Sequence, residues 1–405
     1  MTRLAIDGGA PVRQASWAPW PVFEQDEIDA VTAVLASGRV NYWTGSECQA
    51  FEDEFASYVG RRYGIALANG TVALELALFA HGIGAGDEVI VPARTFIASA
   101  SCVVMRGAVP VVADIDPLTQ GLSADTIRQA LTERTRAIIV VHLAGMPCDM
   151  APIMTLAEER NVLVIEDCAQ AHGGRYRGQV LGALGHCAAF SFCQDKIMTT
   201  GGEGGMFVTD NEAVWRRAWA YKDHGKSWAA THESAHPPGF RWLHESFGTN
   251  WRMTEMQAAI GRRQLMKLDQ WIARRTQNAS IMATALQNVP GLRIPPTPDW
   301  AESAYYKFYA FINPGQLRQG WDQTRIIQAI NAEGVPCFAG SCSEIYKERA
   351  FIYAGFAPQQ RLPEATLQGE TSLMFLVHPT LNDIDIEDAC NATAKVMAVA
   401  VNLDS

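Results

Sequence analysis

The sequence is poor in positive charge and has no long hydrophobic run. Its 33 lysines and arginines are outnumbered by 43 aspartates and glutamates, and the charges are mixed along the chain, with a formal net charge of −10. Nucleic acids and anionic membranes attract clustered positive charge, so neither is an expected partner. No uninterrupted apolar stretch reaches the roughly 18 residues that a membrane span needs, and the first residues do not resemble a secretory signal. We therefore expect a cytoplasmic protein.

Cysteine pairs of the CxxC type are also missing, as are internal repeats and low-complexity tracts. A zinc site usually begins with such a pair, so no metal site is predicted. Cys168 and Cys193 lie close to the motifs described below, but no Cys–His pattern marks either thiol as a nucleophile. Most of the nine cysteines are expected to be small buried hydrophobic residues: Cys48, Cys102, Cys148, Cys168, Cys187, Cys193, Cys337, Cys342 and Cys390.

The first half of the chain alternates two kinds of segment. From about residue 60 to 210, short β-branched runs are separated by helix-like stretches of ten or more residues. Runs that are apolar along most of their length, with helices between them, indicate an α/β fold with a mainly parallel sheet covered on both faces. The seven expected strands are 64–69, 88–93, 109–115, 137–143, 162–167, 187–192 and 205–210.

The second half predicts a smaller α/β domain. Residues from about 211 to 260 are polar and aromatic and indicate an irregular excursion from the sheet. A long helical stretch, a strand, a helix and a second strand come after it. We place a large domain at residues 1–275 and the smaller C-terminal domain at 276–405. The elements expected after the excursion are 253–275, 306–312, 322–334 and 335–340.

Polar residues stand where the expected strands of the large domain end. In parallel α/β sheets, ligands collect at the carboxyl ends of the strands, so a site is expected there. The strand-end residues are Asn69-Gly70-Thr71, Arg94-Thr95-Phe96, His142, Asp167 and Ser191.

The first of these ends, "NGTVALELAL", joins a strand to an apolar-periodic helix. Gly70 and Thr71 place free amide donors and a hydroxyl at the N-terminus of that helix, which suits a phosphate group. A plain helix cap is the alternative. The glycine-rich "HGIGAG" at 81–86 precedes a strand instead of joining strand to helix, so it fails the context of a dinucleotide site and reads as a loop.

The stretch "VIEDCAQAHGG" puts Glu166 and Asp167 at the end of a buried strand. A buried carboxylate needs a cationic or hydrogen-bonding partner. Asp167 could pair with a protonated ring nitrogen, and Gln170 could bond a neighbouring ring oxygen. Alternatively, the acid caps the next turn.

The stretch "SFCQDKIMTTGGEGGMF" surrounds Lys196 with a hydroxyl, Ser191, and with four glycines that allow a tight turn. An isolated lysine is usually a solvated surface group. A lysine that forms a Schiff base, an acid for a pyridine nitrogen, a stacking aromatic and a phosphate cradle are together what pyridoxal phosphate requires. Phe96 is the candidate for the stacking aromatic, although an aromatic beside an apolar helix is often core.

The ordered set "ANGTVALELAL … VPARTFIASA … VVADID … VHLAG … VIEDCAQAHGG … FSFCQDKIMTTGGEGGM … GTNWRMTEMQAAIG" resembles the DegT/StrS-type sugar aminotransferases. These belong to the fold-type-I pyridoxal phosphate superfamily related to aspartate aminotransferase. The resemblance extends from about residue 20 to the C-terminus. It implies a large domain with a mainly parallel seven-stranded sheet, a smaller C-terminal α/β domain, and a homodimer whose active sites are shared between subunits.

The resemblance also implies roles for individual residues. Lys196 matches the Schiff-base lysine, and Asp167 matches the acid that faces the pyridine nitrogen. His142 is expected near the cofactor or acceptor. The remaining matches are Gln170 beside the ring hydroxyl, Phe96 stacked on the ring, Gly70, Thr71 and Ser191 at the phosphate, and Asn250 reaching the phosphate from the neighbouring subunit.

The sequence departs from the family pattern at a few positions. Cys168 stands where alanine is usual, Trp251 where tyrosine is usual, and Gly201-Gly202 where one glycine is more common. None of these changes removes a catalytic group. Related dehydratases have histidine where the lysine belongs, so Lys196 argues against that chemistry.

The function implied by the resemblance is transfer of an amino group from glutamate to a keto sugar, most often a nucleotide-linked keto-deoxysugar used for polysaccharide or natural-product biosynthesis. A glutamine-dependent cyclitol aminotransferase acting on an inosose is the main alternative. A catalytically silent pyridoxal phosphate-binding regulator is another, whereas a nucleotide-binding oxidoreductase would need a glycine fingerprint that is not found. The acceptor pocket is expected to use aromatic and polar side chains, the candidates being Tyr42, Trp43, His142, Tyr306, Tyr346 and His378.

Overall fold

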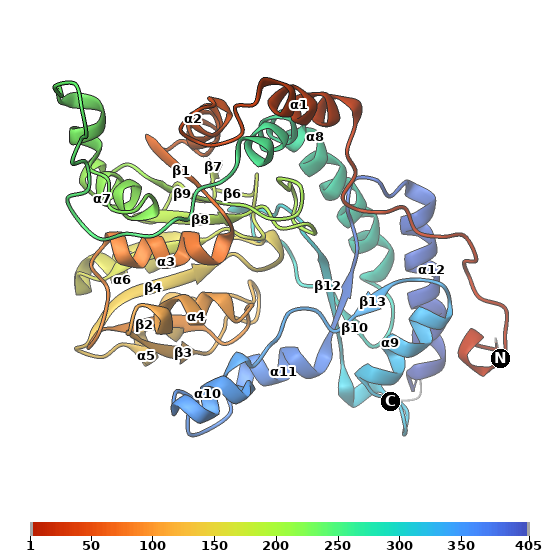
Figure 1. The fold of residues 1–405 in the computed structure, drawn as a ribbon. Coiled ribbons are helices and arrows are strands. Elements are labelled where there is room, and N and C mark those ends of the chain that lie inside the picture. Colours follow the sequence, from red (N-terminus) through yellow and green to blue (C-terminus); the bar gives the residue numbers. More distant parts are fainter. Residues whose placement is uncertain (1–2, 403–405) are drawn as a thin grey trace.

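The computed structural model describes residues 3–402 and is built around two sheets (Figure 1). The larger sheet has seven strands, of which six point the same way, because only β9 is antiparallel to its neighbours β1 and β8. This confirms the predicted fold class and all seven predicted strands. In spatial order the strands are β1 (Tyr63–Leu67), β9 (Gly205–Thr209), β8 (Cys187–Ser191), β5 (Leu163–Asp167), β4 (Thr135–Val141), β2 (Glu88–Pro92) and β3 (Val109–Ala113).

Helices cover both faces of this sheet because its strands are apolar on both sides. Along β4, Ala137 and Ile139 belong to one buried cluster, whereas Ile138 and Val140 belong to the other. The first cluster packs under α3 (Gly70–Ala80), α4 (Ala98–Met105) and α7 (Glu212–Lys222). The second packs under α2 (Glu47–Val59), α5 (Ala124–Ala130), α6 (Met150–Arg160) and the N-terminal half of α8 (Glu255–Leu286).

A smaller antiparallel sheet holds the third buried cluster. Its strands are β10 (Leu292–Arg293), β12 (Phe308–Ile312), β14 (Ser372–Phe375) and β13 (Cys337–Phe338). The C-terminal half of α8, α9 (Gln323–Ala332) and α12 (Asp383–Ala400) pack against it. Leu4 belongs to the same cluster, and both ends of the described chain lie beside this sheet in Figure 1. The helix α8 runs through 275/276, so the domain division at that point stays a prediction.

The remaining elements are short or peripheral. A three-stranded sheet joins β11 (Ala301–Glu302), β6 (Arg175–Tyr176) and β7 (Gln179–Val180). None of the helices in the described part of the chain is both long and apolar enough to cross a bilayer. The other helices are α1 (Gln25–Ser37), α10 (Arg349–Ala354), α11 (Pro363–Thr371) and the helical turns Ala5–Asp7, Leu143–Gly145, Ala229–Glu233, Pro314–Gln316 and Ile345–Lys347.

The predicted irregular excursion at 211–260 is wrong at both ends. Its first residues form α7, which buries Ala218 and Trp219 against the sheet, and its last residues already belong to α8. The polar and aromatic composition hid the helical period, because tryptophan here packs in the core. Between the two helices the chain has one π-helical turn and otherwise irregular backbone.

Candidate active site

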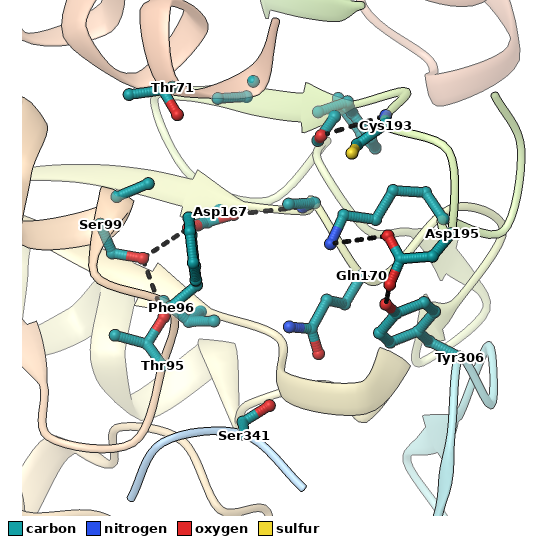
Figure 2. Close-up of a pocket in the computed structure, with 18 of the residues that line it drawn as sticks. Thr71, Thr95, Phe96, Ser99, Asp167, Gln170, Cys193, Asp195, Tyr306 and Ser341 are labelled. Atoms are coloured by element: carbon teal, nitrogen blue, oxygen red, sulfur yellow. Dashed lines mark hydrogen bonds and ion pairs between the residues drawn. The ribbon is translucent and has the colours of Figure 1, made fainter. Parts of the chain in front are cut away.

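A cavity of about 940 Å³ opens at the carboxyl ends of the strands in the seven-stranded sheet (Figure 2). Val141, Asp167 and Ser191, which end β4, β5 and β8, lie in its wall. The opposite wall comes from the small sheet, through residues such as Phe338 and Met374. Small-molecule sites reach roughly 1,000 Å³. The cavity is therefore near the upper end of the size range of small-molecule sites.

Gly70 and Thr71 line one end of this cavity, at the start of α3. The Oδ1 atom of Asn69 accepts a hydrogen bond of 3.0 Å from the amide of Val72, so Asn69 is the helix cap that the sequence offered as the alternative. The helix N-terminus still faces the cavity, with its partial positive charge. A Cβ atom on Gly70 would lie 2.6 Å from Cβ of Ser191, so glycine is what lets β8 approach the helix. The result is a polar end suited to an anion.

Asp167 is a buried carboxylate with neutral partners. Ser99 Oγ donates a hydrogen bond of 2.8 Å to one carboxylate oxygen, and the amide of Ala169 donates one of 3.1 Å to the other. No cationic side chain among residues 3–402 lies within ion-pair distance of it. Burial raises the pKa of Asp167, although these bonds and the charge of Lys196 oppose the shift. A cation placed in the cavity would therefore gain a strong partner.

Lys196 lies on the loop after β8 and lines the same cavity as Asp167. Its Nζ atom lies 3.9 Å from Oδ1 of Asp195 and 5.1 Å from the centre of the Tyr306 ring. The indole of Trp20 donates a hydrogen bond of 2.8 Å to the carbonyl of Lys196 and fixes the loop. Gly202 has φ +124°, which explains why a second glycine stands there.

Asp195 connects Lys196 to Tyr306, whose hydroxyl donates a hydrogen bond to the carboxylate. Burial tends to raise the pKa of Asp195, but the Lys196 ammonium and the Tyr306 hydroxyl outweigh it and hold this pKa below its usual value. The carboxylate therefore stays charged beside the amine. Burial, with Asp195 nearby, raises the pKa of Tyr306, so the phenol remains a hydrogen-bond donor.

Three more of the predicted residues lie in the cavity wall. Phe96 is 67% exposed, unlike a core aromatic, so its ring is free to stack on a bound molecule. Gln170 accepts a hydrogen bond of 2.8 Å from the amide of Ala144, which fixes its side chain with the NH₂ group free to donate. Tyr306 lies on the small-sheet side of the cavity.

Five predicted residues lie outside this cavity. Tyr42 is 3% exposed, and its ring packs under the Lys222 ammonium at 3.4 Å. Trp43 lies beside Lys226 on the same side of the fold. The hydroxyl of Tyr346 donates a hydrogen bond to Glu344, and the ring of His378 is hydrogen-bonded to the hydroxyl of Thr380. Asn250 is exposed on the irregular segment before α8. Within one chain, none of the five reaches the cavity.

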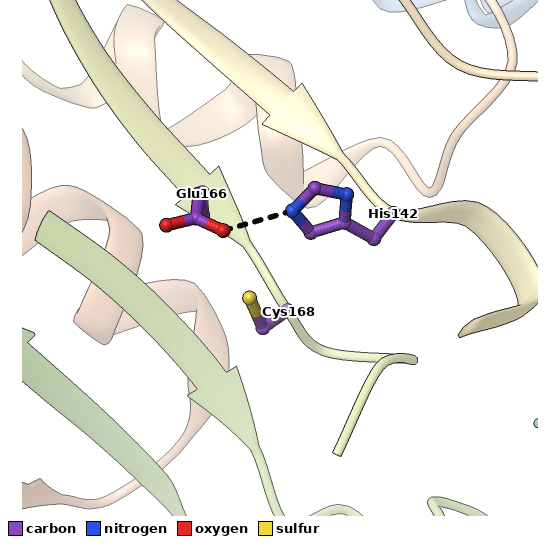
Figure 3. A group of neighbouring side chains, drawn as sticks. All are labelled: His142, Glu166 and Cys168. Atoms are coloured by element: carbon purple, nitrogen blue, oxygen red, sulfur yellow. Dashed lines mark hydrogen bonds and ion pairs between the residues drawn. The ribbon is translucent and has the colours of Figure 1, made fainter. Parts of the chain in front are cut away.

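His142 also lies outside the cavity, in a fully buried cluster with Glu166 and Cys168 (Figure 3). One ring nitrogen is 3.0 Å from Glu166 and the other accepts from the Cys148 amide at 3.1 Å. Glu166 also accepts bonds from the amides of Gly182, Leu184 and Gly185. Burial raises the pKa of the Cys168 thiol. The hydrogen bonds of Glu166 fix the loop after β7. Those of the His142 ring keep it away from the cavity.

The sequence reasoning missed several residues of the cavity wall. Asp195 directly precedes Lys196, Lys307 directly follows Tyr306, and Ser99 comes three residues after Phe96, so each was adjacent to a recognised motif. Ser341 had no such signal, because it comes from a loop of the small domain.

Comparisons with known proteins agree over most of the chain. Residues 21–394 match the model of the DegT/DnrJ/EryC1/StrS aminotransferase family. An L-glutamine:2-deoxy-scyllo-inosose aminotransferase of Streptomyces kanamyceticus is 38% identical over 82% of this chain and 78% of its own length. A GDP-perosamine synthase of Caulobacter vibrioides is 47% identical over 56% of this chain and 58% of its own. The crystal structure of an aminotransferase from Psychrobacter cryohalolentis superposes with a TM-score of 0.93 and 54% identity, covering 95% of this chain and 99% of that one.

Proposed function

The chain belongs to the DegT/DnrJ/EryC1/StrS aminotransferase family and is a pyridoxal phosphate-dependent aminotransferase, and from this premise we propose that it transfers an amino group from glutamate or glutamine to a nucleotide-linked keto sugar. The observation that carries the proposal is one cavity lined both by Lys196 and by a buried acid, Asp167, that has no cationic partner among the described residues. Such a pair is what amino-group transfer on a pyridine ring requires.

The residues present fit the cofactor. The helix N-terminus at Gly70 and Thr71, together with Ser191, forms an anion cradle that a Cβ on Gly70 would fill. The buried Asp167 lacks the positive charge that a protonated pyridine nitrogen would supply. When bound, pyridoxal phosphate supplies a carbonyl carbon that carries nitrogen and a ring that accepts electrons.

The protein's own side chains divide the remaining work. The cradle would hold the phosphate, Phe96 would stack on the ring, and Gln170 would donate a hydrogen bond at its edge. Asp167 would keep the ring nitrogen protonated, since its carboxylate gains a counter-charge that way.

Lys196 would be both the attachment point and the base. Its Nζ atom would take the proton from the α-carbon of the amino donor and return a proton to the carbon that gains nitrogen in the acceptor. Asp195 and Tyr306 would hold the amine near this position between the two transfers. The donor leaves as a keto acid.

Relatives support two acceptor classes. One is named a GDP-perosamine synthase, which favours a nucleotide-linked sugar. Another is named an L-glutamine:2-deoxy-scyllo-inosose aminotransferase and matches a larger share of this chain, which favours a cyclitol ketone as the second candidate. The cavity volume of about 940 Å³ suits a cofactor and an acceptor together.

We also propose that the active enzyme is a cytoplasmic homodimer with shared sites. Asn250 is exposed and does not reach the cavity of its own chain. An exposed polar residue of this kind is available to a neighbouring subunit, as the resemblance to the family implies.

The proposal is tested by the visible absorption spectrum of the purified enzyme saturated with pyridoxal phosphate. The band of the cofactor bound to Lys196 should disappear when glutamate or glutamine is added. It should return when the correct keto acceptor follows, from a panel of nucleotide-linked keto sugars and inososes. A band that ignores both donors would contradict the aminotransferase assignment and favour the silent regulator. Return of the band with an inosose alone would select the cyclitol enzyme.

A further inference from the structure

Lys307 is an unpaired cation in the cavity wall. It directly precedes β12 of the small sheet and lines the same cavity as Lys196. Its ammonium lies 4.7 Å from the centre of the Tyr306 ring and makes no hydrogen bond or ion pair with any of residues 3–402. Charged groups that are largely removed from water are normally paired. An ammonium without a partner in a cavity wall therefore points to an anionic ligand.

The charges around Lys307 also favour an anionic ligand. Arg275 is 1% exposed. Its Nη1 atom donates hydrogen bonds to the carbonyls of Tyr305 and Tyr306. Its Nε and Nη2 atoms have no hydrogen-bond partner among the described residues. Asp195, which Lys196 and Tyr306 already contact, is the acid that acts on Lys307. Lys196 and Lys307 thus share one carboxylate, while Arg275 adds a third positive charge near Lys307. An anion bound there would restore the balance.

The position of Lys307 selects the anion. We assign the cofactor phosphate to the cradle at Gly70 and Ser191, beside the seven-stranded sheet, whereas Lys307 directly precedes a strand of the smaller sheet. The Nζ atoms of Lys196 and Lys307 lie 5.1 and 4.7 Å from the centre of the same Tyr306 ring. Lys196 must reach the α-carbon of the donor, and the α-carboxylate is attached to that carbon. A diphosphate would lie beyond the sugar ring, several bonds from the reacting atom.

We propose that Lys307 binds the α-carboxylate of the amino donor, with Arg275 behind it. This inference rests on the proposed function, because it assigns one end of the donor in the same cavity. Both glutamate and glutamine carry the α-carboxylate, so the contact serves either donor.

The protonation state of Lys307 should make the affinity for the amino donor depend on pH. Burial lowers its pKa to about 8, with Arg275 and Lys196 contributing and Asp195 opposing. Its charge is therefore present below that pH and lost above it. Donor affinity should fall as the pH rises through about 8, and this step should be missing in a variant without the amine.

The test uses the enzyme saturated with pyridoxal phosphate and the variants Lys307→Met, Lys307→Arg and, as a control, Lys347→Met on the exposed surface. The spectral half-reaction is titrated with glutamate and with glutamine, and 2-oxoglutarate binding is measured separately from the cofactor spectrum. Lys307→Met should weaken binding of all three roughly tenfold or more. Lys307→Arg should recover part of the loss, and Lys347→Met should behave as wild type. Cofactor occupancy should be equal in all variants.

Three outcomes would overturn the inference. Unchanged donor affinity in Lys307→Met would show that the amine binds no part of the donor. A loss for glutamate and 2-oxoglutarate, but not for glutamine, would assign Lys307 to the side-chain carboxylate. A loss confined to the KM of the keto acceptor would assign it to the acceptor's diphosphate. If the wild-type enzyme itself responds to neither donor, the proposed function fails, and this result is distinct from the other three.

Discussion

Ser99 on α4 donates a hydrogen bond of 2.8 Å to Asp167 at the end of β5, and its hydroxyl also lies 2.8 Å from that of Thr95. The hydrogen bond between Ser99 and Asp167 joins α4, the helix after β2, to β5, the strand that carries the acid. Because Asp167 has this neutral donor and no cation within ion-pair distance among the described residues, its carboxylate would gain a counter-charge from the protonated ring nitrogen that we propose it faces.

Replacing Asp167 with asparagine should slow the half-reaction with the amino donor by roughly 100- to 1,000-fold, since a neutral amide cannot stabilise a protonated ring nitrogen. Ser99→Ala should cost less, roughly tenfold, because it removes one hydrogen bond to a charged group. Stopped-flow absorption measures both rates. Asp125→Asn, at a carboxylate that is 85% exposed, is the matched control. An unchanged rate in Asp167→Asn would mean that this acid has been misassigned.

Lys196→Ala should lower turnover by at least roughly a thousandfold, because it removes both the attachment point and the base. The visible band of the cofactor bound to lysine should be absent as well. Lys347→Ala, at the exposed end of the helical turn Ile345–Lys347, should keep both properties. Near-normal turnover in Lys196→Ala would refute the assignment of the base.

Gly70→Ala should weaken pyridoxal phosphate binding roughly tenfold or more, because overpacking costs about 1 to 3 kcal/mol and the added Cβ would lie 2.6 Å from Cβ of Ser191. Fluorescence titration of the apo-enzyme measures the affinity. At Gly84 the nearest atom to an added Cβ is 3.6 Å away, so Gly84→Ala should bind the cofactor normally. Equal affinities in the two variants would place the phosphate elsewhere.

Inactive Asn250→Ala and Lys196→Ala subunits, mixed and allowed to exchange, should regain roughly a quarter of wild-type activity. Half of the dimers would be hybrids, each with one intact site assembled from the two undamaged residues. The control is a mixture of Lys196→Ala with Lys196→Met, in which no intact site can form. Failure of the first mixture to recover, with subunit exchange verified by mass, would argue against a shared site.

His172 should make the fold sensitive to acid. Burial lowers its pKa to about 3, with help from the charges of Lys196 and Arg275. A folded-state pKa below the unfolded value of about 6.5 contributes stability above pH 6.5 that is lost as the pH falls toward 3, at roughly 1.4 kcal/mol per pH unit.

Urea unfolding at pH 7 and pH 5 measures this loss. His172→Phe, whose ring would lie among Phe55, Phe190 and Phe192, should lose less stability between the two values than wild type. The exposed His244→Phe should lose as much as wild type. Identical losses in all three proteins would remove His172 from the explanation.

The sequence by itself determined the large sheet and the centre of the cavity. Its seven apolar runs and the helices between them left a parallel sheet as the favoured arrangement, and parallel strands end at one edge. Residues that end or follow different strands, such as Gly70, Asp167 and Lys196, therefore had to gather there. The helix α7 was missed because its tryptophans resembled loop aromatics, although the structure buries Trp219.

Only the tertiary structure decided what surrounds that centre. Tyr306 and Lys307 reach Lys196 from a second sheet more than a hundred residues away in the sequence, and no local pattern specifies how two sheets are placed. The sequence did not indicate the directions of the side chains either. His142 follows a strand that ends in the cavity wall, yet it turns to Glu166, because a buried carboxylate and a buried imidazole are most stable when they satisfy each other.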